Sequence, residues 1–157
     1  AWSYGVRSMM VDTMNQRPFI VYAPVQSDRT ADSLAELDRE LRELLRERPI
    51  EEEEVSTSKK RNTLTLPGRW ETARAVAGDI AQLVRFGLPD DYWNSYADLV
   101  SAVSVEETNT TARTELKPDQ LIWIVVGDLG EIESEVRALG LGELDLMDAD
   151  GRLLTSR

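Results

Sequence analysis

Carboxylate and tyrosine side chains are the groups of this sequence that could do chemistry, because the chain contains no histidine and no cysteine. Their absence excludes Ser-His-Asp and Cys-His catalysis, disulfides and nearly every kind of protein zinc site. An all-oxygen metal site, or proton transfer by Asp, Glu, Lys or Tyr, stays open. Clustered acids and tyrosines are therefore the candidates to weigh.

Two acidic clusters meet this description. Asp145, Asp148 and Asp150 are similar to a fragment of a calcium loop, in which oxygen ligands stand at alternate positions. No closing glutamate follows them, so a plain acidic turn is favoured. Asp90 and Asp91 are adjacent carboxylates that stand where a helix begins, and capping is expected there. We therefore expect no self-sufficient active site, no cofactor and no metal ion in this chain.

Length and charge narrow the classes of protein further. The 157 residues suffice for one domain, and we expect residues 1–157 to form a single one. The net charge of -11 disfavours binding to nucleic acid. The longest apolar run, residues 121–126, has the length of a strand, so we expect no membrane span.

The first half of the sequence predicts a hairpin and two helices. Residues 2–11 and 17–25 are rich in β-branched and aromatic side chains, which favours two antiparallel strands. A helix capped by Asp28 follows and ends before Pro49, with its apolar face formed by Leu34, Leu37, Leu41, Leu44 and Leu45. We interpret the acidic run 51–54 as the start of a second helix rather than a recognition patch.

The middle of the sequence predicts three more helices. Pro67-Gly68 breaks the chain before a helix whose buried stripe should be Ala73, Val76, Ala77, Ile80 and Val84. Asp90 should cap the next helix, and its aromatic residues are expected to be core rather than a ligand cage. Ser104 and Glu107 form a capping box that opens the fifth helix. The sequon at Asn109 lies inside that helix, so we take it as incidental.

The end of the sequence predicts strands around a short helix. Leu121–Val126 is apolar on both faces, which is typical of a central strand. A helix with Ile132, Val136 and Leu139 follows, and residues 144–147 alternate like an edge strand. The order of elements predicts an α+β fold, with helices over a mainly antiparallel sheet.

Several segments occur together in the order and spacing of one known pattern. They are Trp2–Val6, Phe19–Tyr22, the helix after Asp28, Leu66–Arg69, Gly87–Tyr92 and Ile124–Asp128. The chain thereby resembles the C-terminal portion of the insulinase/pitrilysin family of zinc metallopeptidases, which includes mitochondrial processing peptidase. It is most similar to the last domain of the large bacterial periplasmic members.

The resemblance implies a role without catalysis. In that family one domain carries the zinc motif H-x-x-E-H, and homologous zinc-free domains close over it. Zinc is thus expected in a partner catalytic domain, of the same or another polypeptide, in the periplasm. Zinc-free halves carry an arginine some positions before a tyrosine, and both grip the substrate peptide. Tyr4 falls on the tyrosine position, with Trp2 and Ser3 flanking the groove.

The arginine of that pair has no counterpart here, since Arg7 lies on the wrong side of Tyr4. This gap, with the start in mid-strand, leads us to expect an N-terminally truncated domain. An unpaired sheet edge would favour association of the chain with itself.

Two other functions stay open, namely a structural or assembly domain of a non-catalytic homologue and a standalone acidic binding module. From the residues alone, Tyr4 could also be an ordinary strand tyrosine.

Overall fold

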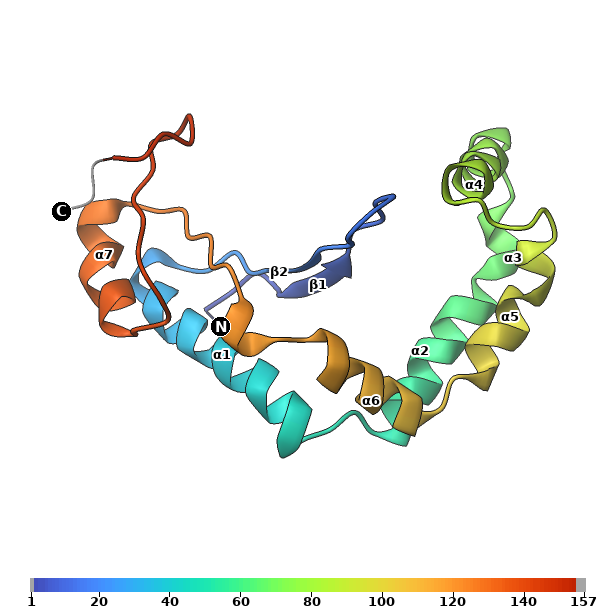
Figure 1. Ribbon diagram of the computed structural model, residues 1–157, viewed down its shortest axis with the longest axis horizontal. Helices are drawn as coiled ribbons and strands as arrows, with labels where there is room; N and C mark the ends of the chain where they lie inside the picture. Colours follow the sequence, from blue (N-terminus) through green and yellow to red (C-terminus); the bar gives the residue numbers. More distant parts are fainter. Residues whose placement is uncertain (1, 155–157) are drawn as a thin grey trace. The chain divides into compact units, whose positions relative to one another are not determined.

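The computed structural model describes residues 2–154 and divides the chain into two compact units (Figure 1). The first unit contains the described parts of Ala1–Ser8, Val21–Glu40 and Ile122–Arg157, and the second contains Met9–Ile20 and Leu41–Leu121. The boundaries between the units fall within the two strands and the longest helix of the described chain and after Leu121. The expectation of a single domain over residues 1–157 stays a prediction.

The expected hairpin is present, with shorter strands than predicted. Strands β1 (Arg7–Met10) and β2 (Phe19–Tyr22) form a two-stranded sheet. An isolated antiparallel bridge between Ser3 and Val25 continues the pairing beyond the strands. Ser3, before β1, is therefore held beside Val25, after β2, although a bend at Tyr4 separates this pair from the strands.

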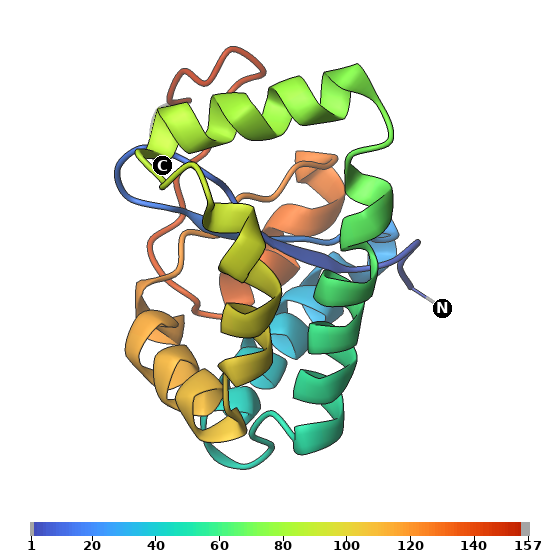
Figure 2. The same cartoon turned by 90° about the vertical axis from the view of Figure 1, so that its right-hand side faces the viewer.

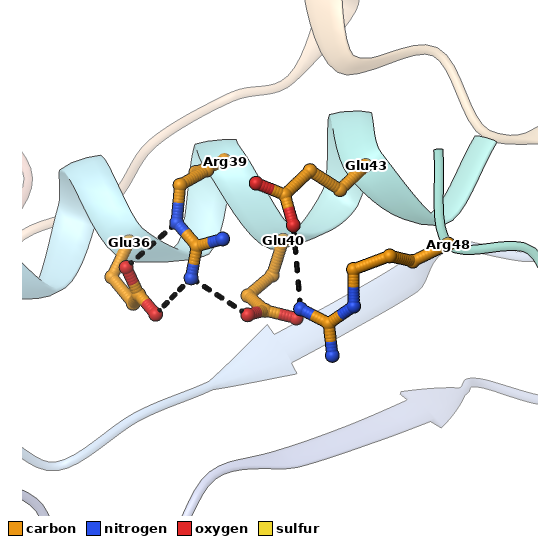
Figure 3. Close-up of polar contacts among 5 residues, drawn as sticks. All are labelled: Glu36, Arg39, Glu40, Glu43 and Arg48. Atoms are coloured by element: carbon orange, nitrogen blue, oxygen red, sulfur yellow. Dashed lines mark hydrogen bonds and ion pairs between the residues drawn. The ribbon is translucent and has the colours of Figure 1, made fainter. Parts of the chain in front are cut away.

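Helix α1 (Thr30–Arg46) confirms the predicted amphipathic helix. Asp28 does not cap it, because this residue lies inside the 3-10 helix η1 (Ser27–Arg29) that precedes α1. Its leucine face is covered, since Leu34 is buried and Leu37, Leu41, Leu44 and Leu45 are half-buried. The polar face carries ion pairs. Figure 3 shows Arg39 between Glu36 and Glu40, and Glu43 with Arg48. Exposed pairs of this kind contribute little each, so the leucine face explains the helix.

The second unit is built around helix α2 (Glu52–Leu64), which contacts α5 (Tyr92–Ala102) and α6 (Val105–Glu115). The α2 and α5 helices run side by side in Figures 1 and 2. Val55 of α2 is buried. The acidic run opens α2 as predicted, because Glu51 and Glu54 form a capping box with each other's backbone.

Two boundaries differ from the sequence prediction. Pro67-Gly68 does not break the chain but lies within the short helix α3 (Leu66–Arg69), because proline is tolerated in a first helical turn. Asp90 does not cap α5, whose N-cap residue is Asp91, and that cap has no side-chain hydrogen bond. The capping box at Ser104 is confirmed, with a 3.1 Å bond from the Glu107 N–H to the serine hydroxyl.

Helix α4 (Ala73–Phe86) ends, as predicted, at Gly87, whose φ of 62° suits glycine. Its predicted buried stripe, however, is exposed. Ile80 is 55% and Val84 79% exposed, and Ala73, Val76 and Ala77 are exposed as well. The buried residue of this helix is Asp79, on another face. The prediction of a buried stripe on this helix is therefore wrong, because the spacing of apolar residues does not tell whether another element covers them.

The predicted central strand is the main correction near the C-terminus. Within residues 2–154, Leu121–Val126 pairs with no other strand, and its alternate residues Ile122, Ile124 and Val126 are exposed. Helix α7 (Leu129–Ala138) follows as expected, with Ile132 buried. The predicted edge strand at residues 144–147 is reduced to one antiparallel bridge between Met147 and Leu153. Neither segment forms the predicted strand, because a strand needs a neighbouring strand for its backbone hydrogen bonds.

The fold class predicted from the sequence is confirmed. The described chain is rich in helices and carries a small antiparallel sheet, which defines an α+β fold. No helix within residues 2–154 is both long and apolar enough to cross a membrane.

Asn109 joins α6 to the loop before α2, a role that the sequence did not reveal. Its side-chain amide donates to the carbonyl of Ile50 (2.8 Å) and accepts from the Ile50 N–H (2.9 Å). A further bond reaches the Val105 carbonyl at 3.1 Å, and Asn109 is only 9% exposed. A small polar side chain thereby satisfies both backbone groups of a residue that has no helical partner.

Replacing Asn109 by alanine should therefore lower the free energy of unfolding by about 1–3 kcal/mol, since both backbone groups of Ile50 lose their partners. Urea unfolding followed by circular dichroism measures the change. The control is Asn94→Ala on the exposed face of α5, which should stay within about 0.5 kcal/mol of the parent. Equal effects of the two variants would contradict the stabilising role of the hydrogen bonds between Asn109 and Ile50.

Candidate functional site

The tyrosine singled out by the sequence lies in a bend between the Ser3–Val25 bridge and β1. The side chain of Tyr4 is 93% exposed, and its hydroxyl makes no hydrogen bond within the described residues. Its backbone N–H donates to the Pro24 carbonyl at 3.4 Å. Gly5 follows with a φ of 123°, a conformation that favours glycine. The phenol is thus presented to solvent from a backbone that is fixed on one side.

Ser3, the second predicted residue, braces this segment. Its hydroxyl donates to the Pro24 carbonyl (2.8 Å) and accepts from the Gly5 N–H (3.1 Å). The backbone bonds beside it come from Tyr4 and from Gln26, whose N–H reaches the Trp2 carbonyl at 3.1 Å. Within residues 2–154 the backbone N–H and C=O of Ser3 make no hydrogen bond, because they face the opposite edge.

Trp2, the third predicted residue, lines a groove in the first unit. The groove has a volume of about 320 Å³, and its walls come from the segment before β1, the segment after β2 and the first turns of α1. Its lining residues are Trp2, Ser3, Val6, Ala23, Val25, Ser33, Glu36 and Leu37. The indole is 48% exposed, with the Arg29 guanidinium 5.6 Å from the ring centre. The structure thus brings Trp2 and Ser3 together at the groove, while Tyr4 stands outside its lining.

Binding is the chemistry that this arrangement supports. The groove offers apolar walls to a side chain, and the free edge at Ser3 offers a backbone donor and acceptor to an extended peptide. Zinc does not fit the residues present, since the sequence has no histidine or cysteine. Within residues 2–154 no three carboxylates gather closely enough to hold a metal ion.

The acidic cluster near the C-terminus forms the plain turn that was predicted. A carboxylate oxygen of Asp148 accepts the N–H groups of Asp150 and Arg152, each at 2.9 Å. Asp150 pairs with the Arg152 guanidinium at 3.4 Å. Gly151 completes the turn with a φ of 77°. The carboxylates are therefore used to order the turn itself.

A second polar cluster, in the other unit, went unnoticed in the sequence. Asp79 accepts from Arg69 through both carboxylate oxygens (2.7 and 2.6 Å) and from the Trp70 indole N–H (2.7 Å). The Arg69 guanidinium also covers the ring of Trp93 at 4.4 Å. Trp93 makes edge-on contacts with Trp70 and Tyr92. The aromatic residues thus pack on one another and on Arg69. They do not form the buried core that the sequence predicted, since Tyr92, Trp93 and Tyr96 are half-buried and Trp70 is exposed.

The Arg69 hydrogen bonds hold the pKa of the Asp79 carboxyl below its usual range, with a smaller contribution from Trp70 and against the effect of burial. The same contact raises the pKa of Arg69. Asp79 is only 8% exposed, so its partners matter to stability. The signal that could have revealed the cluster is an acid placed one turn from apolar residues on a helix that follows an Arg-Trp pair.

The fold can be compared with solved structures. A peptidase M16 inactive domain from Pseudomonas fluorescens is similar, with a TM-score of 0.64 and 18% sequence identity over 76% of this chain. The chain spans only 28% of the length of that neighbour. At this identity the similarity shows the fold alone. No protein-family model matches the sequence, and no curated protein does.

The fold of the chain is therefore similar to that of this peptidase M16 inactive domain, in agreement with the fold that the sequence resemblance implied. The similarity is not specific to a C-terminal domain. The three substrate-binding residues suggested by the resemblance, Tyr4, Trp2 and Ser3, stay predictions.

Stability should depend on pH through Asp79. Because its pKa is lower in the folded protein, the contribution is complete above the unfolded value and is lost as the pH falls below about 4. Asp79→Asn should lower the free energy of unfolding at neutral pH by about 1–3 kcal/mol and flatten its decline in acid. Urea unfolding, repeated from pH 7 down into the acidic range where stability declines, measures both changes in the free energy of unfolding.

The control is Asp98→Asn on the exposed surface of α5, which should keep the acid decline of the parent. If Asp79→Asn declined in acid as steeply as the parent, the ion pair would not be the source of the pH dependence.

Proposed function

We propose that this chain is a zinc-free, peptide-binding domain of an insulinase/pitrilysin-type metallopeptidase. The supporting observation is the exposed Tyr4 beside an unpaired strand edge, on the fold of an M16 inactive domain. Cleavage would belong to a catalytic domain that holds zinc, in the same or a partner polypeptide. The chain itself has no histidine with which to contribute a zinc ligand.

The peptide would add as a strand along residues 2–4. One edge of this segment already pairs with residues 24–26, which fixes its conformation before a ligand arrives. The other edge presents the Ser3 N–H and C=O. Main-chain bonds of this kind supply affinity without reading the sequence of the peptide. A preformed edge also reduces the entropic cost of ordering the bound peptide.

Side chains would add selectivity and alignment. The groove beside Trp2 is large enough for an apolar side chain of the peptide. The Tyr4 hydroxyl can donate to a peptide carbonyl, because no protein group within the described residues uses it. Both contacts would hold the peptide in register for attack by the partner domain, which contributes to catalysis through positioning.

From the resemblance to large bacterial members we propose that this function is carried out in the periplasm. We also propose that the chain is the last domain of such a protein. Both assignments rest on the quoted sequence segments rather than on the fold.

A structural or assembly domain without peptide binding is the second candidate. One observation favours it, namely the exposed apolar face of α4, with Ile80 and Val84 largely open to solvent. Such a face is typical of a surface that packs against another domain. In that case Tyr4 would have no ligand.

Tyr4→Phe should weaken peptide binding by about 2- to 10-fold, the effect of losing one hydrogen bond. The probe is a fluorescein-labelled decapeptide of alternating valine and threonine, measured by fluorescence anisotropy with the full 157-residue chain. Tyr22→Phe, at a tyrosine that is 60% exposed on β2, is the matched control and should bind like the parent.

A second probe separates backbone pairing from nonspecific hydrophobic binding. The same peptide with N-methylated amides should bind at least about 10-fold more weakly, because it cannot donate the backbone hydrogen bonds that join two strands. Equal binding of both peptides, or of Tyr4→Phe and the parent, would contradict the proposed role. Absence of any binding to the parent would favour the assembly function.

A further inference from the structure

Helix α4 turns a partly polar face toward the rest of its unit. Its buried residue is Asp79, and the half-buried residues at helical spacing from it complete this inward face. The inward residues are Ala75, Asp79, Gln82, Leu83 and Phe86. The apolar residues of the helix lie largely on the opposite, exposed side, so apolar burial contributes little to holding α4 in place.

A single polar cluster joins α4 to the elements beside it. Within residues 2–154 no backbone hydrogen bond connects α4 to another element. Apart from its own cap at Thr72, the side-chain hydrogen bonds that reach the helix come from Arg69 and Trp70 and end on Asp79 and Gln82. In the described part of this unit, the helices in close backbone contact are α2 with α3, α5 and α6, and α4 is not among them.

The donors of this cluster are anchored on α5 rather than on α4. The Arg69 guanidinium lies 4.4 Å from the ring centre of Trp93, and the Trp70 ring makes an edge-on contact with the same indole at 5.9 Å. At the other end of α4, the Arg17 guanidinium lies 5.6 Å from the Phe86 ring, which is a weak contact at an exposed site. The bonds to Asp79 are therefore the place where α4 can separate from its unit.

Irregular backbone lies on both sides of the helix. Residues 70–72 form a turn and a bend between α3 and α4. Gly87 follows α4 in the left-handed conformation, and its N–H and that of Leu88 bond back to carbonyls of α4 itself. A few linker residues of this kind can absorb the dihedral changes of a hinge.

We propose that α4 is a hinged arm, docked through the Asp79 cluster, which opens from its unit as one element while α2, α5 and α6 stay folded. Opening breaks the bonds of Asp79 with Arg69 and Trp70 and leaves both donors on Trp93. The 14 residues of α4 are too few for a stable isolated helix in water, so the open arm also loses its helical hydrogen bonds. The inward face decides this behaviour, whatever contacts the outward face.

Hydrogen–deuterium exchange of the full 157-residue chain, followed by mass spectrometry of its peptic fragments, tests the proposal. Amides of α4 should exchange at least about 10-fold faster than those of α2, because they become exposed without unfolding of the unit. Limited trypsin digestion gives a second measurement. The first cut within a helix of this unit should fall at Arg74 or Arg85 of α4 rather than at Lys60 or Arg61 of α2.

Variants of the cluster test what holds the arm. Asp79→Asn should raise the exchange rate of α4 by about 5- to 100-fold, while α2 still exchanges at least about 100-fold more slowly than an unstructured peptide. Trp70→Phe removes only the indole N–H and should raise the rate of α4 by about 2- to 10-fold, so it tests the same bonds with a milder change. The matched control is Ile80→Ala, at the exposed neighbour of Asp79, which should stay within about 3-fold of the parent.

Two results would overturn the proposal. The first is exchange of α4 as slow as that of α2 in the parent chain, which would mean that the two helices open together. The second is exchange of α4 in Asp79→Asn and Trp70→Phe no faster than in Ile80→Ala, which would mean that the Asp79 cluster does not hold the helix.

Discussion

The main constraint on this structure is that the chain buries little apolar surface. Among residues 2–154 the buried apolar side chains are Leu34, Val55 and Ile132, each on a different helix. Hydrophobic burial is the main favourable contribution to folding, so a small core makes specific polar contacts important. Asn109 and Asp79 provide such contacts, by fixing the backbone at Ile50 and the guanidinium of Arg69. The same shortage leaves apolar faces available for other chains.

Local signals in the sequence predicted most elements correctly. The capping box at Ser104 and the helix end at Gly87 depend on neighbouring residues only, so they could be recognised without a structure. The face of α4 and the strand at Ile122–Val126 could not, because periodicity tells which residues favour burial but not what covers them. The bonds of Asn109 reach Ile50, which lies 59 residues away in the sequence, so no local pattern reveals them.

The candidate site rests on a different kind of signal and stays a prediction. Tyr4 was selected through a family resemblance, since an exposed tyrosine near a strand has no distinctive spacing. Its exposure and the free edge at Ser3 are consistent with a peptide contact. The bracing role of the Ser3 hydroxyl depends on the Pro24 carbonyl across the hairpin, so it could not be read from residues 2–5 alone. A rigid, noncatalytic edge is what a domain needs to position a substrate for a partner.

The central claim is that this chain positions peptides for a zinc peptidase. The most direct test isolates the native polypeptide that contains this segment from its source cells and determines its mass and bound zinc. The account predicts a product several-fold heavier than 17.7 kDa that carries zinc, either in itself or in a partner that purifies with it. A native chain of 17.7 kDa without a zinc-bearing partner would contradict it.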